Sequence, residues 1–425
     1  MATEKTTRER VAAGLARRNR KESLFRATGI LATAVGVLFL GVFFATLVVK
    51  GSTAFKQTFL QLDITLDSDV IAPSGKLDLN YADFDGLVRS GLRKGFPEVT
   101  SRDDRRKLNR LVSLGASYQL RSLVEKNPEL IGTTQTLWVP ASSEVDMLIK
   151  GNIDANVDEA LRTLSDDQIA WVSRLQESGR VESRFNSALF TNGDSREPEL
   201  AGIKGAVMGS FYMLLVTITL SFPIGVAAAI YLEEFAPRSR LSDLIEVNIN
   251  NLAAVPSIVF GLLGLAVFIN WMALPRSAPL VGGLVLTLLT LPVIIIASRA
   301  AIQAVPPSIR EAALGLGASE TQVVFHHVLP LAMPGMLTGA IIGMSRALGE
   351  SAPLLMIGMV AFIVDVPGSF TDPATALPVQ IYLWADSPER AFAERTSAAI
   401  IVLLGFLLLM NLAAVIMRKR MERKW

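Results

Sequence analysis

Six long apolar runs, separated by polar segments, limit what this 425-residue chain can fold into. A helix needs about 20 apolar residues to cross a bilayer core of about 30 Å, and its backbone polar groups must be bonded within the helix. We therefore predict an all-α polytopic membrane protein with six transmembrane helices. The runs are Ala27–Val49, Ala206–Leu232, Leu252–Trp271, Leu280–Ala300, Met336–Val364 and Ser397–Met417.

The first run follows a basic segment, residues 1–25. A signal peptide has a shorter apolar region that ends in a small-residue cleavage site, so we predict a retained transmembrane helix over 26–50. The chain ends in a second basic tail, residues 418–425. Because Lys and Arg concentrate on the cytoplasmic side of membrane proteins, we expect both termini to lie in the cytoplasm. The chain is then a multi-pass protein of the bacterial inner membrane.

Residues 51–200 form a polar block between the first two spans, with 23 acidic and 18 basic residues. With the N-terminus inside, this block lies outside the cytoplasm. Arg102–Lys126 and Asp154–Gln176 show helical spacing of apolar residues, and Gln135–Val139 and Val181–Phe185 resemble short strands. We predict a small inserted α+β extracytoplasmic domain, called the insert below, and we find no catalytic constellation in it.

Composition excludes several function classes. The chain has no cysteine, and its two histidines are the adjacent pair His326 and His327. Disulfides, thiolate metal sites and cysteine nucleophiles are therefore excluded, and a P-loop sequence is absent. We expect no enzyme activity, no metal and no cofactor in this chain, and no nucleic acid partner.

A polar loop, residues 305–335, lies between the fourth and fifth spans. Ser308 stands three residues before Glu311, and Ser319 three before Gln322, which is the spacing of two capping boxes. Gly317 interrupts between them. The pattern predicts a helix, a glycine break and a second helix that ends near Pro330, with a largely apolar stripe of Val323, Val324, His327 and Val328. The stripe can equally rest on the bilayer.

This loop resembles the EAA loop of importer-type ABC permeases, whose pattern is Glu-Ala-Ala, three residues, Gly, nine residues, Ile, any residue, Leu-Pro. The matching positions are Glu311, Ala312, Ala313, Gly317, Leu329 and Pro330. His327 stands where the family usually has isoleucine. The resemblance implies that the loop docks into a cytoplasmic ATPase, and we call residues 305–335 the EAA loop.

A narrower resemblance covers most of the remaining chain. The segments VPSIVFGL at 255–262, SRALGESAPLL at 345–355 and AAIYLEEFAP at 228–237 are similar to the permease family of phosphate-specific importers. Residues 51–200 resemble an N-terminal extension of one long branch of that family. The resemblance implies an importer-type ABC permease domain over 201–417.

The same resemblance implies the partners. A second, homologous permease subunit completes the pore, a pair of cytoplasmic ATP-binding subunits holds the ATP and Mg, and an extracytoplasmic phosphate-binding protein delivers the substrate. The lipid bilayer surrounds the permease. The substrate is then inorganic phosphate.

Two charged residues fall inside the fifth span. Arg346 and Glu350 are four residues apart, so they share one helix face and can pair. A charge at mid-bilayer costs about 2.5–3.5 kcal/mol on insertion scales. The pair either neutralises itself within the bundle or belongs to the substrate pathway, where the planar guanidinium of arginine suits phosphate oxygens. Pro256, in the third span, is either an ordinary kink or part of a gate, and Ser257 is a candidate hydrogen-bonding group.

Alternative functions remain open at this point. Another oxyanion, sulfate or molybdate, is the nearest alternative substrate. A membrane-anchored sensor that uses residues 51–200 as its receptor is a second alternative, although it has no need of five further spans.

Overall fold

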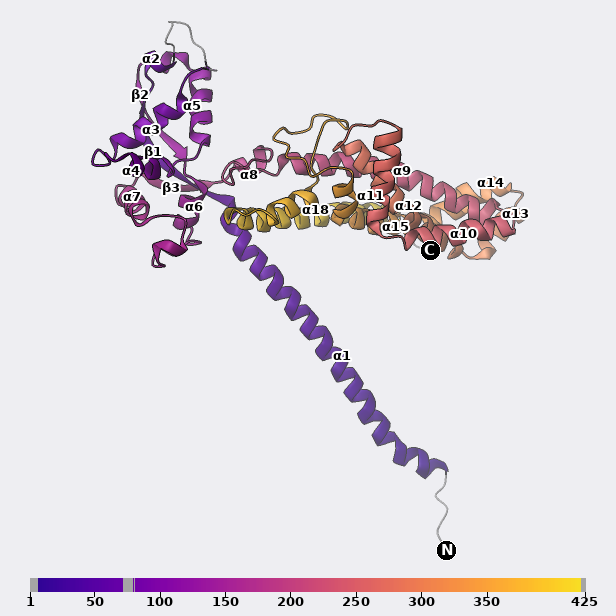
Figure 1. The fold of residues 1–425 in the computed structure, drawn as a ribbon. Coiled ribbons are helices and arrows are strands. Elements are labelled where there is room, and N and C mark those ends of the chain that lie inside the picture. Colours follow the sequence, from indigo (N-terminus) through magenta and orange to yellow (C-terminus); the bar gives the residue numbers. More distant parts are fainter. Residues whose placement is uncertain (1–6, 72–78, 80, 422–425) are drawn as a thin grey trace. The chain divides into compact units, whose positions relative to one another are not determined.

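The computed structural model describes residues 7–71, 79 and 81–421 (Figure 1). The chain divides into two compact units, residues 1–50 and residues 51–425. Lys5 of the basic N-terminal tail and residues 422–425 of the C-terminal tail lie outside the described residues.

The first unit is one helix, α1, which spans Thr7–Ser52. Its apolar side chains, such as Phe39 and Val49, are exposed. A helix that is apolar on all sides and polar only at its start suits a hydrocarbon environment. The segment Arg18–Phe55 is long and apolar enough to cross a membrane, in agreement with the predicted first span.

The insert is built on a three-stranded antiparallel sheet in the order β2-β1-β3. The central strand β1, Lys56–Thr65, pairs with β2, Thr134–Pro140, and with β3, Val181–Phe185. The two predicted strands are confirmed, whereas β1 was missed. Its burial alternates, as expected of a strand with one face on a core.

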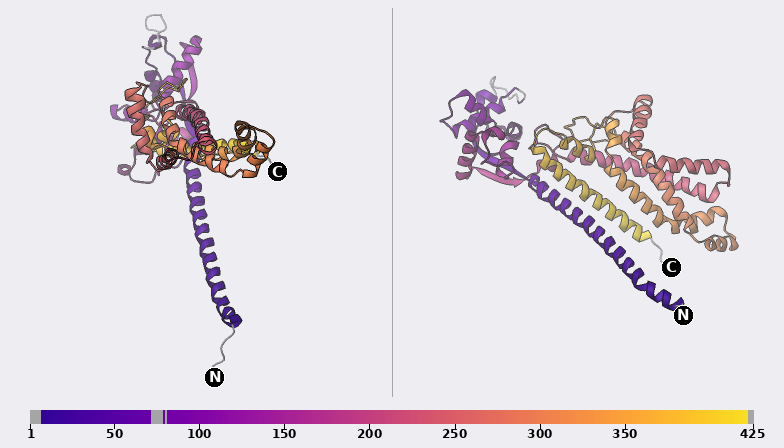
Figure 2. Two further views of the ribbon diagram at one scale, coloured as in Figure 1. Left: turned by 90° about the vertical axis from the view of Figure 1, so that its right-hand side faces the viewer. Right: turned by 60° about the horizontal axis from the view of Figure 1, so that its bottom comes forward.

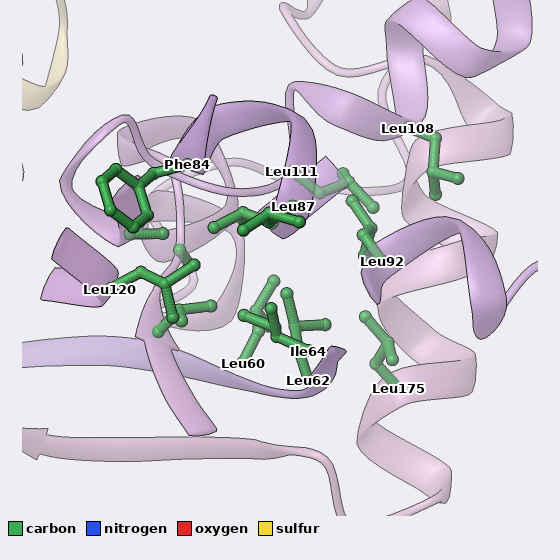
Figure 3. Close-up of a cluster of buried hydrophobic side chains, with 14 of the residues drawn as sticks. Leu60, Leu62, Ile64, Phe84, Leu87, Leu92, Leu108, Leu111, Leu120 and Leu175 are labelled. Atoms are coloured by element: carbon green, nitrogen blue, oxygen red, sulfur yellow. The ribbon is translucent and has the colours of Figure 1, made fainter. Parts of the chain in front are cut away.

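Helices cover one face of this sheet, and the core between them holds Leu60, Leu62 and Ile64 of β1 (Figure 3). The predicted helix Arg102–Lys126 is in fact two helices. The chain leaves the helix after Asn109 because Ser113 donates its backbone N–H to the carbonyl of Pro140 and Val112 bridges to Ala141. The helices are α2 Ser68–Ile71, α3 Phe84–Lys94, α4 Arg102–Asn109, α5 Gly115–Lys126, α6 Ser143–Ile149, α7 Asp166–Glu177 and α8 Ala188–Thr191.

Buried charges join the insert to the last helix, α18, which spans Ala391–Met421. The Nζ of Lys150 lies 2.6 Å from a carboxylate oxygen of Asp146 and 2.6 Å from one of Glu394, and all three side chains are less than 10% exposed. Asn152 donates to the other oxygen of Glu394 at 3.0 Å. Asp146 in turn accepts the backbone N–H of Thr58 in β1. The sheet, α6 and the start of α18 therefore form one connected polar network.

The remaining helices form the membrane part of the second unit. Helix α12 packs against α9 and α15, and α18 packs against α15, so these long helices lie side by side (Figures 1 and 2). Glycine allows the close approach: a Cβ on Gly339 of α15 would lie 2.3 Å from the Cβ of Ala297 in α12. The helices are α9 Lys204–Ile230, α10 Arg240–Ala253, α11 Ser257–Gly264, α12 Pro279–Gln303, α13 Pro307–Gly315, α14 Glu320–Gln322, α15 Leu329–Gly349, α16 Ala352–Met356 and α17 Leu377–Ala385.

Five helices of the described chain are long and apolar enough to cross a membrane, and a bent pair can provide a sixth span. The bent pair corresponds to the predicted third span. Within that span the chain turns by 101° between α10 and the segment Ser257–Trp271, so the bend predicted at Pro256 is present. Pro256 stands at that break and begins α11 as its N-cap.

The predicted fifth span, Met336–Val364, is misplaced. It begins earlier, in the segment Glu320–Gly349, and ends at Gly349. Proline has no N–H to donate and its ring clashes with the carbonyl four residues earlier, and Pro353 stands four residues after Gly349. The chain therefore leaves α15, forms the short α16 and packs that turn against α11.

Candidate functional site

The EAA loop folds as two helical segments around a glycine turn. Helix α13 ends at Gly315, and Gly317 adopts φ +87°, the left-handed conformation that favours glycine after a helix. The second capping box is confirmed: Gln322 donates its backbone N–H to Ser319 Oγ at 3.3 Å, and Ser319 donates its own to Gln322 Oε1 at 2.9 Å. The glycine break is therefore where the sequence predicted it.

Two details of the predicted loop are wrong. Pro306, not Ser308, is the N-cap of α13, and no side chain caps that end. Proline suits the first turn of a helix, so Pro307 starts α13 one residue before Ser308. The second helix also does not end near Pro330. It continues into α15. Pro330 has no N–H to donate, and the wider π-helical turns of Val323–Val328 let the helix continue without that hydrogen bond.

The inner face of the loop is anchored by small apolar residues. Ala313 packs with Val323, Val324 and Val328, and the cluster includes Ile302 at the end of α12. His327 is exposed, so it does not belong to the stripe that the sequence predicted. The residue at the usual isoleucine position therefore makes no apolar contact with this cluster. The valines of the π-helical turn Val323–Val328 make those contacts instead.

The outer face of the loop is open. Glu311 and Ala312 are exposed, and Leu316 is 91% exposed. Leu314 and Phe325 add further exposed apolar surface. An acidic residue surrounded by exposed apolar side chains on a firmly held loop can bind a partner protein.

Arg310 fixes this loop to the end of α9. Its Nη2 lies 2.8 Å from Glu234 Oε1 and also donates to the carbonyl of Ile302, while Nη1 donates to the carbonyl of Val305 at 2.7 Å. Glu234 lies in the π-helical turn Tyr231–Phe235 that follows α9. One guanidinium thus joins α9, α12 and α13. This role was not predicted from the sequence, although Arg310 directly precedes the Glu-Ala-Ala sequence.

Arg299 of α12 makes a second connection of the same kind. It pairs with Glu233 at 2.5 Å and with Glu246 of α10 at 2.9 Å, and Gln303 donates to Glu233 as well. The adjacent pair Glu233 and Glu234 therefore holds α10, α12 and α13 on the end of α9. The signal in the sequence was two neighbouring glutamates immediately after an apolar run.

The predicted pathway pair forms, but its surroundings differ from the prediction. Arg346 Nε lies 3.4 Å from Glu350 Oε1. Arg346 sits in the last turn of α15, and Glu350 is the residue that ends it, with extended ψ of 124°. The pair thus lies at the end of the helix and not near its middle. Beside it, Ser345 donates to Asn411 of α18 at 2.7 Å.

Pro256 and Ser257 begin α11, whose next turn packs on α16. A Cβ on Gly261 would lie 2.7 Å from the Cα of Pro353, so the two helices are in direct backbone contact there. Within the described residues, Ser257 makes no hydrogen bond to Arg346 or Glu350. The structure therefore brings the two helices together but does not join the four predicted pathway residues into one cluster.

A bundle of long apolar helices with a helical polar loop anchored at one end defines a polytopic membrane protein. Residues 221–424 match the family model of the binding-protein-dependent transport system inner membrane component. Residues 12–159 match a domain of unknown function, DUF3333.

Curated relatives agree with this class. The chain is 32% identical over 217 residues to the phosphate transport system permease protein PstA 1 of Mycobacterium tuberculosis, which covers 51% of this chain and 70% of that protein. It is 30% identical over 224 residues to PstA of Haemophilus influenzae, covering 53% and 78%. The match to the probable ABC transporter permease protein YqgI of Bacillus subtilis is 35% identical over 174 residues, covering 41% of this chain and 58% of that protein. Among solved structures, the MetNI methionine ABC transporter matches with a TM-score of 0.42 and 20% identity, covering 52% of this chain and 97% of that chain.

The chain belongs to the binding-protein-dependent transport system inner membrane component family. It is a permease subunit of an ABC importer, an all-α polytopic inner membrane protein with a small inserted α+β domain.

Proposed function

We propose that this chain is a permease subunit of an ATP-driven importer of inorganic phosphate. The observation that carries the proposal is the similarity to two proteins named phosphate transport system permease over 70–78% of their length. In this arrangement the insert, residues 51–200, lies outside the cytoplasm, both termini lie inside, and the substrate passes between this chain and a second permease subunit.

The EAA loop transmits force from a pair of cytoplasmic ATP-binding subunits, which carry the ATP and Mg. Glu311, Ala312 and the exposed Leu316 provide the docking face, and Gly317 shapes the turn. Ala313 holds the loop on the bundle, while Leu329 and Pro330 lead into α15. Because Arg346 lies in the last turn of α15, a movement of the loop reaches the pathway through one continuous helix.

Arg346 binds phosphate oxygens during passage, and Glu350 holds its guanidinium between transport events. The guanidinium is 43% exposed and only 3.4 Å from its single carboxylate partner, so it can exchange that partner for an anion. Pro256 provides the bend before α11, and Ser257 offers a hydroxyl to a passing oxyanion. An extracytoplasmic phosphate-binding protein delivers the substrate.

Uptake of labelled phosphate by cells or proteoliposomes, with sulfate and molybdate as competitors, tests the substrate. We expect unlabelled phosphate alone to compete. Competition by sulfate or molybdate at equal concentration would identify another oxyanion as the substrate.

Arg346→Ala tests the pathway. Losing a hydrogen bond to a charged group costs about 1.5–3 kcal/mol, so uptake should fall roughly tenfold or more with normal subunit assembly. Arg276→Ala, an exposed arginine without an ion pair in the described chain, is the matched control. Unchanged uptake by Arg346→Ala would exclude the pathway role.

Glu311→Ala tests docking. It should reduce co-purification of the ATPase, whereas Glu320→Ala, an exposed glutamate in the same loop, should not. Equal co-purification by both variants and the wild type would refute the docking role of Glu311.

A further inference from the structure

A cavity of about 800 Å³ lies between the insert and the segment that precedes α18. One wall comes from α4, α6 and the residues after them, including Asn109, Arg110 and Glu144. The other wall includes Glu199 and Glu389. The cavity lies away from the EAA loop and from Arg346, and the proposed transport function does not use it.

Both acidic and basic side chains line the cavity. The acidic ones include Glu144, Glu197, Glu199 and Glu389, and none of these forms a salt bridge within the described part of the chain. Burial raises the pKa of Glu199 and the Glu197 carboxylate raises it further, whereas a hydrogen bond with Ser113 and the charge of Arg395 lower it. Burial likewise raises the pKa of Glu144, while the charge of Arg110 lowers it. Because the net shift is upward in both, the cations already present compensate these carboxylates only in part.

Glu199 gives the strongest indication of a ligand. The residue is only 2% exposed, and its Oε2 has no hydrogen-bond partner. Asn109 Oδ1 and Ser142 Oγ line the same cavity and are also unpartnered. Buried acceptors that lack a donor are rare in native proteins, and three of them around one cavity call for a ligand rich in N–H groups.

The cavity also offers donors for an anion. Arg162 has a side chain only 6% exposed, and its Nε and Nη1 lack partners although Nη2 pairs with Asp166. Arg106, Arg110 and Arg390 line the cavity, are exposed and form no ion pair among the described residues. A bare polycation would be repelled by these arginines, whereas a ligand that also carries a carboxylate would pair with them.

The lining does not suit a metal ion. Among the described residues, no group of three His, Asp or Glu side chains is placed to hold a metal ion. An ammonium or guanidinium group carries several N–H donors and reaches acceptors that lie farther apart.

We propose that this cavity binds a bipolar ligand, with its ammonium or guanidinium group against Glu199 and its carboxylate toward Arg162. The ligand is either a free basic amino acid or two neighbouring side chains, one basic and one acidic, on a protein that docks over the cavity.

Titration of the full-length permease in nanodiscs with L-arginine, followed by calorimetry, tests the site. We expect saturable binding that weakens about tenfold or more in Glu199→Gln, the scale of one lost charge-assisted hydrogen bond. Agmatine, which lacks the carboxylate, should bind more weakly than arginine. Glu177→Gln, an exposed glutamate on α7 outside the cavity, should leave binding unchanged.

Arg162→Met provides a second test that does not depend on the stability of Glu199→Gln. The substitution removes the guanidinium proposed to bind the carboxylate of the ligand. We therefore expect weaker binding of L-arginine and unchanged binding of agmatine, which has no carboxylate. Unchanged binding of L-arginine, or equal weakening of both ligands, would overturn the proposal.

Three further outcomes would also overturn it: no saturable binding of arginine to the wild type, equal binding to the wild type and Glu199→Gln, or displacement of arginine by inorganic phosphate alone. Competition with the extracytoplasmic binding protein distinguishes the two sources. Displacement of arginine by that protein supports a site for a protein-borne side chain, and retention of arginine supports a site for a free molecule.

Discussion

The guanidinium of Arg310 lies 2.8 Å from Glu234 Oε1, which ties the residue before the Glu-Ala-Ala sequence to the end of α9. The same guanidinium donates to two carbonyls at the end of α12. Because the side chains of Arg310 and Glu234 are only 24% and 12% exposed, solvent screens this contact weakly. The loop therefore cannot move without moving α9 and α12.

Glu234→Gln should separate docking from transport. The substitution keeps the shape of the side chain but removes the charge that holds Arg310, at a cost of about 1–3 kcal/mol. We expect the ATPase to remain attached, because Glu311 and Leu316 are unchanged, while uptake falls several-fold. Co-purification of the ATPase and uptake of labelled phosphate, measured for the same variant, check this expectation. Glu320→Gln is the control, and loss of both signals in Glu234→Gln would mean that the ion pair only maintains folding.

Two glycines of the EAA loop should respond in opposite ways to alanine. Gly317 has φ +87°, which costs a residue with a Cβ about 1–2 kcal/mol. Gly315 lies in α13 with open space around it, so Gly315→Ala should stabilise the helix by up to about 1 kcal/mol. Thermal unfolding and ATPase co-purification of the two variants should therefore differ in sign. Equal behaviour would contradict the left-handed turn.

Gly261→Ala should disrupt the contact between α11 and α16. The new Cβ would lie 2.7 Å from the Cα and 2.8 Å from the carbonyl oxygen of Pro353, and neither backbone atom can rotate away. Overpacking of this kind costs about 1–3 kcal/mol. We expect a lower Tm and reduced uptake. Gly405→Ala in α18, where nothing lies within 4 Å, should match the wild type.

Lys150→Met should destabilise the insert strongly. It would leave the carboxylates of Asp146 and Glu394 buried without their shared cation, which typically costs about 3–5 kcal/mol. Lys107→Met removes a more exposed pair with Asp167, at 3.4 Å, and should change stability by no more than about 1 kcal/mol. Thermal melts followed by tryptophan fluorescence distinguish the two. A small effect at Lys150 would show that water reaches this network.

The buried glutamates of the cavity predict that the free energy of unfolding depends on pH. Burial raises the folded-state pKa of Glu199 above its ordinary value of 4.5, so the folded state holds its proton to higher pH than the unfolded state does. Between the ordinary pKa of the unfolded state and the raised pKa of the folded state, the free energy of unfolding must fall as the pH rises. The Tm of the wild type should therefore increase when the pH is lowered toward the ordinary value, and Glu199→Gln should reduce this increase. Glu144 and Glu389 shift in the same direction, so the slope should decrease without vanishing.

The sequence predicted features that depend on local patterns. Apolar runs of sufficient length located five long helices, and the spacing of Ser319 and Gln322 located a capping box that the structure contains. Strands β2 and β3 were found from their composition. Strand β1 was missed although Leu60, Leu62 and Ile64 alternate with Gln61 and Asp63, which is the pattern of a half-buried strand.

Features that depend on distant partners were not predictable from one sequence. The end of α15 at Gly349 depends on the packing of α16 against α11, and nothing near Gly349 indicates that contact. Glu233 and Glu234 hold arginines 66 and 76 residues away in the chain. His327 looked like part of an apolar stripe, because helical spacing of 3.6 residues does not apply in the π-helical turn Val323–Val328.

The position of β1 in the sheet has a consequence for biosynthesis. The central strand is the first to leave the ribosome, yet its neighbours are completed only at Pro140 and Phe185. Pairing over such long separations is slow, because a long loop must close before the contact stabilises it. β1 therefore waits with both edges unpaired until β2 is complete at Pro140, and with one edge unpaired until β3 is complete at Phe185. During this interval the nascent chain is most exposed to aggregation and to proteases.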